Sequence, residues 1–240
     1  MFENLAAAMS KAMITLSQGE LNCLPYCRSL LDFCDIRGKA ARPLVVRCVV
    51  FGSGKPQVKW WTQRTLSQAL PEVLAADHAV GEMSVQFYEE GKTTAQAVAV
   101  RYIKLGYPGL KDQDKTLGNF HGGQWLGHLV VVCEKTLIDL TIGQVNSSKL
   151  SINLNPPHLT FEAKEEFLAG TALFVHSFCG SVIVYQAYPD ERTYEKSGSW
   201  TDQTFRRQLR QVAESVAKAF EGKPDQDLHQ PERVPDTNGK

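Results

Sequence analysis

Three residues in this chain of 240 have types and positions that suit nucleophilic chemistry at a carbonyl group: Cys23, His128 and Asp139. A thiolate attacks carbonyl carbon, an imidazole can carry its proton, and a carboxylate can orient the imidazole. Cys23 opens an apolar stripe that predicts a helix, and the N–H groups and dipole at a helix start stabilise a thiolate. Its backbone N–H is also placed to donate to an oxyanion. The alternative is that Cys23 only continues the apolar stripe of its helix.

His128 and Asp139 lie in two short apolar runs that predict a β-hairpin. If Glu134 and Lys135 form a two-residue turn, Val130 lies opposite Asp139. Side chains alternate along a strand, so His128 and Asp139 then share one face as diagonal neighbours, about 7–8 Å apart at the backbone. A register slip of one residue would place them on opposite faces. A His–Asp pair on a hairpin is also compatible with a purely structural hydrogen bond.

An oxyanion hole usually needs a second hydrogen-bond donor, and two glutamines are candidates. Gln18 precedes Cys23 by five residues, and Gln124 lies just ahead of the strand predicted for His128. The simpler interpretation of each is a solvated side chain. The sequence has no C-x-x-C pair and no H-E-x-x-H motif, so we expect neither a metal ion nor a cofactor.

Periodicity predicts the elements that must position these residues. Apolar residues at three- and four-residue steps predict a helix over residues 1–18. A second helix begins at Asn22, a good N-cap, and stops at Gly38. A strand follows over residues 43–51, rich in β-branched side chains.

In the rest of the chain, the hydrophobic periodicity predicts some helices and strands clearly and leaves one segment ambiguous. Residues 62–76 predict a helix, whereas residues 83–104 fit a strand or a helix. Two hairpins and a closing helix are predicted over 126–133 with 136–141, 172–178 with 181–188, and 201–220. We therefore expect one domain over residues 1–221, with residues 52–124 as an insertion or elaborated connection, and a disordered tail over residues 222–240.

Composition limits the class of protein. Hydrophobic residues make up 43% and charged residues 22%, which is typical of a globular chain. Twenty-six basic residues balance twenty-six acidic ones, which argues against nucleic acid or an anionic membrane as the main partner. No apolar run approaches the ~18 residues needed to span a bilayer, and no secretory signal is evident. We expect a cytoplasmic protein whose six cysteines are free thiols.

Three stretches resemble one enzyme family. The stretch NCLPYCRSLLDFCDIRGKAARPLVV resembles the cysteine-bearing helix of transglutaminase-like, papain-fold enzymes, although Lys39 and Ala40 replace the usual apolar residue and proline. The stretch GHLVVVCEKTLIDLT resembles the family's His and Asp strands, with an Asp-x-Thr signature at Asp139. VYQAYPDERTYEKSGSW resembles the segment before the closing helix of several bacterial members. The resemblance covers residues 19–51 and 124–221.

The resemblance implies an α+β fold with a papain-like, transglutaminase-like core, in which the cysteine helix packs on an antiparallel β-sheet. It also implies a Cys23–His128–Asp139 triad that transfers acyl groups through a thioester. We expect a peptidase or amidase that acts on a protein or peptide substrate. A protein transglutaminase or deamidase, or a papain-fold interaction module without activity, are the alternatives, and an arylamine acetyltransferase ranks third.

Overall fold

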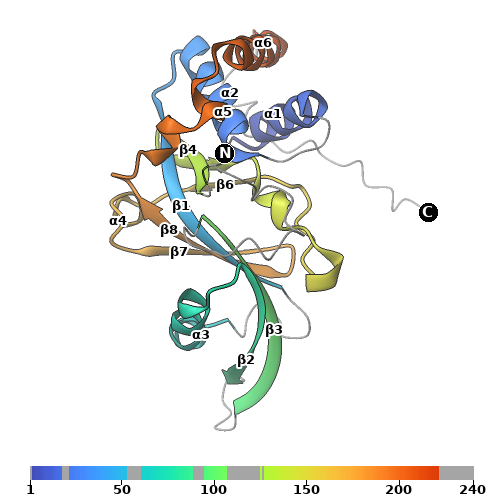
Figure 1. Ribbon diagram of the computed structural model, residues 1–240, viewed down its shortest axis with the longest axis vertical. Coiled ribbons are helices and arrows are strands. Elements are labelled where there is room, and N and C mark those ends of the chain that lie inside the picture. The colour runs from blue at the N-terminus through green and yellow to red at the C-terminus, as the bar shows by residue number, and fades with distance from the viewer. Residues whose placement is uncertain are drawn as a thin grey trace, which may run out of the picture.

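The structure is a computed structural model that describes residues 2–17, 22–52, 61–88, 95–106, 125 and 127–221. Both oxyanion candidates, Gln18 and Gln124, lie outside these residues, and so does the segment 222–240 predicted to be a tail. Within them, the chain forms helices and antiparallel strands in the order shown in Figure 1.

The first two helices follow the predicted periodicity and capping. They are α1 (Glu3–Leu16) and α2 (Cys23–Ile36). The side chain of Asn22 accepts a hydrogen bond from the Leu24 N–H at 3.2 Å, so it caps α2 as expected. Gly38 follows the helix with φ +64°, a conformation that favours glycine, and this explains why α2 ends there.

Eight strands form one antiparallel sheet in which β2–β3–β1–β4–β5–β6 are neighbours and the β7–β8 hairpin also joins β1. Their bounds are β1 (Ala41–Gly52), β2 (Val80–Tyr88), β3 (Ala95–Leu105), β4 (His128–Cys133), β5 (Thr136–Asp139), β6 (Leu159–Glu162), β7 (Leu173–Phe178) and β8 (Ser181–Tyr188). The two hairpins predicted from sequence, β4–β5 and β7–β8, are confirmed.

The long strand β1 organises the sheet because three strands pair with it. Along one edge, β4 pairs with its first half and β3 with its second half, while β8 pairs with its other edge. The sheet curls so far that the edge strands β6 and β7 approach each other (Figure 1). Phe161 of β6 stacks on Phe174 of β7 with ring centroids 3.7 Å apart.

The region predicted to be an insertion contributes strands to this same sheet. Helix α3 (Gln63–Ala75) forms where residues 62–76 predicted a helix, with Thr62 as its N-cap. The ambiguous segment 83–104 forms parts of β2 and β3, and β3 pairs with β1. The buried ammonium of Lys104 on β3 donates to the Val73 carbonyl oxygen at 3.0 Å, near the end of α3.

Short elements complete the fold between and after the strands. They are η3 (Ile142–Val145), η4 (Ser148–Leu150), α4 (Glu165–Leu168), η5 (Thr193–Lys196) and α5 (Gly198–Thr201). The closing helix is α6 (Gln203–Ala219), and the side chain of Asp202 caps it by accepting from the N–H groups of Thr204 and Phe205 at 2.8 and 3.0 Å.

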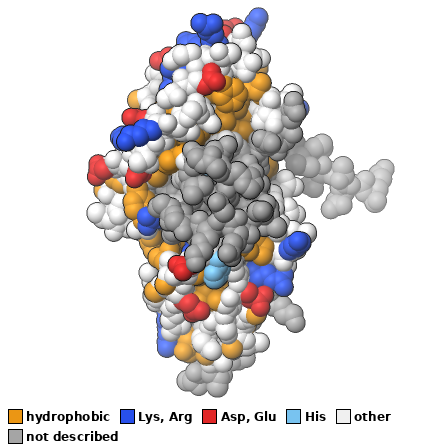
Figure 2. Space-filling model, viewed as in Figure 1, with side chains coloured by type: hydrophobic (Ala, Val, Ile, Leu, Met, Phe, Trp, Pro, Cys, Tyr) orange, Lys and Arg blue, Asp and Glu red, His pale blue; other side chains and the backbone are white. Residues whose placement is uncertain are grey.

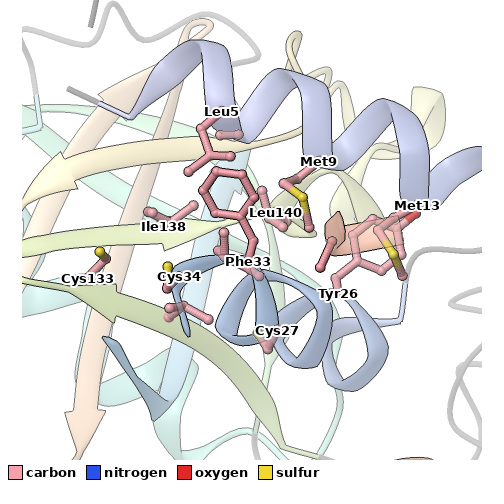
Figure 3. Close-up of a cluster of buried hydrophobic side chains, with 14 of the residues drawn as sticks. Leu5, Met9, Met13, Tyr26, Cys27, Phe33, Cys34, Cys133, Ile138 and Leu140 are labelled. Carbon is pink, nitrogen blue, oxygen red and sulfur yellow. The ribbon is translucent and has the colours of Figure 1, made fainter. Parts of the chain in front are cut away.

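Helices α1, α2 and α6 cover one face of the sheet, while the curl of the sheet encloses a second core. Figure 3 shows side chains of α1 and α2, such as Met9 and Phe33, close to Ile138 and Leu140 of the β5 segment. This is the α+β architecture that the sequence predicted, with helices gathered on one face of an antiparallel sheet. Among the described residues, no helix combines the length and apolar character needed to cross a membrane.

We expect that ending the chain after Glu221 leaves the melting temperature essentially unchanged, whereas ending it after Asp202 prevents folding. Helix α6 buries Leu209 and Val216, and its C-cap residue Phe220 is buried as well. Burial of such side chains contributes ~1.5–3 kcal/mol each, or roughly 5–9 kcal/mol together, which approaches the whole stability of a domain. Thermal unfolding followed by circular dichroism checks both truncations. A large destabilisation by the first would show that residues 222–240 pack on the domain.

Candidate active site

The start of α2 brings Cys23 to the start of β4. The Cys23 thiol lies 3.7 Å from the carbonyl oxygen of Gly127, the residue that precedes His128. Cys23 is buried, with 7% of its surface exposed. Cys23 is the first residue of α2 and therefore lies in the first turn of the helix.

The His128–Asp139 pair is formed. His128 Nε2 lies 2.7 Å from Asp139 Oδ2, and the two side chains are 1% and 0% exposed. The predicted hairpin register is confirmed, because Cys133 pairs with Thr136 and Val131 pairs with Ile138. Since the carboxylate only accepts, Nε2 carries a proton and donates it, which leaves Nδ1 as the ring nitrogen able to exchange a proton with a thiol.

Charge within the pair keeps the imidazole protonated. Burial alone would lower the pKa of His128, but the charge of Asp139, the hydrogen bond to it and a hydrogen bond to Cys23 together raise that pKa from 6.5 to about 10. Burial alone would raise the pKa of Asp139, yet the charge and hydrogen bond of His128, with two further hydrogen bonds, hold it below 3.8. At neutral pH the two groups are therefore an ion pair.

Two residues that the sequence did not identify complete the environment of Asp139. The Tyr185 hydroxyl on β8 donates to Asp139 Oδ2 at 2.9 Å. Thr141 donates to Oδ1 from its backbone N–H at 2.9 Å. Thr141 belongs to the Asp-x-Thr signature, which assigns it no role, and the sole sequence signal for Tyr185 is a hydroxyl group inside an apolar strand. The hydrogen bonds from Tyr185 and Thr141 hold the Asp139 carboxylate in place, and the carboxylate in turn orients the His128 imidazole.

Gln144 is a third residue that the sequence did not identify. It lies in η3, and its amide Nε2 is 3.1 Å from Nδ1 of His128. Nδ1 therefore faces Gln144, while Cys23 is a further neighbour whose interaction with the ring raises the pKa of His128. A side-chain amide can donate to a neutral imidazole or, after rotation, accept from an imidazolium. Gln144 can thus hold the ring in place in both of its protonation states.

Two glycines allow the chain to pack tightly around His128. Gly106, just after β3, has φ +77°, and a side chain there would meet the backbone of His128 and the Val46 carbonyl. A side chain at Gly127 would overlap the ring of Trp125. The Trp125 indole N–H in turn donates to Thr193 Oγ1 at 2.8 Å, so Trp125 is anchored to η5.

Cys27 lies one turn further along α2 and has a different environment. Its thiol donates to the Leu129 carbonyl oxygen at 3.0 Å, and it is buried. Burial, followed by the nearby Cys23 and Asp139, raises the pKa of Cys27 well above 9.0. A thiol that is buried and held protonated is a poor nucleophile, so Cys23 remains the candidate.

The structure thus brings together Cys23, His128 and Asp139, the three residues selected from sequence, and does not describe Gln18 or Gln124. Within the described ranges, no three His, Cys, Asp or Glu side chains gather as a metal site. No protein-family model matches the chain, and neither curated proteins nor solved structures provide a match.

Proposed function

We propose that this protein is a cysteine-dependent acyl-transfer enzyme with a papain-like, transglutaminase-like core, acting on amide bonds of a protein or peptide. One observation carries the proposal. The thiol of Cys23, at a helix start, lies 3.7 Å from the carbonyl oxygen of Gly127, beside His128, whose imidazole is held by the buried carboxylate of Asp139. A nucleophile, a proton carrier and an orienting carboxylate in this order are the minimum set for thiol catalysis.

Each residue of the triad has a separate role in the proposed reaction. The Cys23 sulfur attacks the amide carbonyl carbon, and the proton of its thiol resides on His128 Nδ1. The resulting oxyanion lies near the backbone N–H of Cys23, one of the N–H groups that have no partner within the helix at a helix start. As the C–N bond breaks, His128 returns the proton to the leaving amine, and a thioester remains on Cys23. Water, activated by the same imidazole, then releases the acid and restores the thiol.

Acetylation by p-nitrophenyl acetate tests this proposal without knowledge of the natural substrate. The sulfur should take the acetyl group and release p-nitrophenolate in a burst of one equivalent per protein, and mass spectrometry should place the acetyl group on Cys23. Cys23→Ala should abolish the burst with an unchanged melting temperature. Cys27→Ala, the matched control on the same helix face, should retain it.

Two outcomes would overturn the assignment. One is a burst that survives Cys23→Ala but is lost in Cys27→Ala, and the other is an acetyl group placed only on the exposed Cys179. Addition of methylamine during turnover then identifies the acyl acceptor. Release of acetate in its presence indicates a hydrolase, whereas N-methylacetamide as the main product indicates transfer to amines and the transglutaminase alternative.

A further inference from the structure

A groove of about 720 Å³ lies between α2 and α6, away from the triad, with η5 and α5 at its end. Each helix contributes a stripe at steps of three and four residues. On α6 the stripe is Gln203, Arg206, Arg207 and Arg210, and on α2 it is Arg28, Leu31, Asp32 and Asp35. Residues with this spacing share one helix face, so the groove follows the line along which the two helices meet.

The cationic side chains of this groove are all arginines. Five of the chain's eleven arginines line it and no lysine does: Arg28, Arg192, Arg206, Arg207 and Arg210. Figure 2 shows basic and acidic side chains together at the end of the molecule that carries α6. The guanidinium group binds carboxylates in a bidentate manner and is more weakly hydrated than an ammonium group, so it suits recognition of anionic groups.

Two neighbouring arginines of this groove are outside its direct ion pairs, although the charge of Arg206 still acts on Asp32. Arg28 pairs with Asp32 at 3.7 Å, and Arg210 pairs with Asp35 at 3.7 Å. Arg206 and Arg207, by contrast, form no ion pair with any residue that the structure describes. They occupy neighbouring positions on α6 and face the groove. An anionic ligand would therefore meet two guanidinium groups that need not first break an existing salt bridge.

The remaining lining favours a polypeptide over a polyanion. Leu31 and Trp200 supply apolar surface, and Trp200 lies under the Arg28 guanidinium at 5.4 Å from the ring centroid. Asp32, Asp35 and Glu195 place carboxylates in the same groove. These would repel a backbone with one phosphate per unit, but they suit the N–H groups of a peptide. The chain's net charge of zero points in the same direction.

We propose that this groove binds an acidic segment of a partner protein, with carboxylate side chains against Arg206 and Arg207 and apolar side chains on Leu31 and Trp200. Its volume lies within the range of pockets that hold small molecules and short peptides. Cys23, His128 and Asp139 do not line it, so this binding does not depend on the proposed acyl transfer.

Fluorescence anisotropy with a defined probe tests the groove. The probe is a fluorescein-labelled decapeptide of alternating Glu and Leu, compared with a Gln–Leu peptide and a ten-nucleotide single-stranded DNA. The intact protein should bind the acidic peptide best. Arg206→Gln combined with Arg207→Gln should weaken that binding about tenfold or more, since two charge-assisted hydrogen bonds are lost.

The matched control is Lys11→Gln combined with Lys218→Gln, which removes the same charge from exposed positions of α1 and α6 outside the groove. It should change the affinity less than twofold, and Cys23→Ala should leave it unchanged. If both double variants weaken binding of the acidic peptide equally, net charge alone explains the effect, and the proposal is overturned. So would tighter binding of the DNA, or equal binding of the Gln–Leu peptide.

Discussion

His128→Ala should slow alkylation of Cys23 by iodoacetamide roughly 10²-fold or more, the usual contribution of a positioned proton carrier. In the intact protein, Cys23 should react fastest of the six thiols at neutral pH although it is only 7% exposed. The reason is the adjacent imidazole, whose pKa of about 10 keeps a positive charge beside the sulfur. Without His128 that charge is absent, and burial alone should govern the rate.

Cys179 provides an internal reference for this measurement because it is the exposed cysteine. Its alkylation rate, followed by mass spectrometry of the same digests, should be unaffected by His128→Ala. If Cys179 outpaces Cys23 in the intact protein, accessibility rather than activation determines reactivity, and the triad is a structural arrangement. Equal slowing of both thiols in the variant would instead indicate a general change in the fold.

The parts of the site that follow from local rules could be predicted from sequence. Side chains alternate along a strand, so counting from an assumed turn at Glu134 was enough to place His128 and Asp139 on one face. Capping of α2 by Asn22 is equally local, because donor and acceptor lie two residues apart. Both predictions needed only neighbours within one hairpin or one helix turn.

Contacts that depend on distant strand pairing could not be predicted in this way. Tyr185 reaches Asp139 from 46 residues away, through the pairing of Cys48 on β1 with Tyr185 on β8. No local pattern fixes that register. The segment 83–104 was ambiguous for a related reason. Burial alternates along β2, but β3 is buried continuously over its last residues, a pattern that a buried helix also produces.

The buried ion pair predicts the largest loss of stability. Asp139→Ala should lower the free energy of unfolding by about 3–5 kcal/mol, since it leaves a buried imidazole without its partner charge. It also leaves the hydroxyl of Tyr185 and the N–H of Thr141 without the carboxylate that accepts from them. Urea unfolding followed by fluorescence measures the loss. Asp35→Ala is the control, because its exposed pair with Arg210 should contribute at most about 1 kcal/mol.

The pH dependence separates the ion pair from simple loss of packing. The folded-state pKa of His128 is raised from 6.5 to about 10, so its contribution is complete below pH 6.5 and is lost as the pH rises to about 10. The pKa of Asp139 is lowered, so its contribution is present above 3.8 and is lost as the pH falls below that value. The difference between the intact protein and Asp139→Ala should therefore be greatest between about pH 4 and 6.5 and should shrink toward pH 10. If this difference in the free energy of unfolding stays constant from pH 6 to pH 10, Asp139 stabilises the fold by packing and neutral hydrogen bonds. That result would contradict the proposal that a charged imidazole lies beside Cys23.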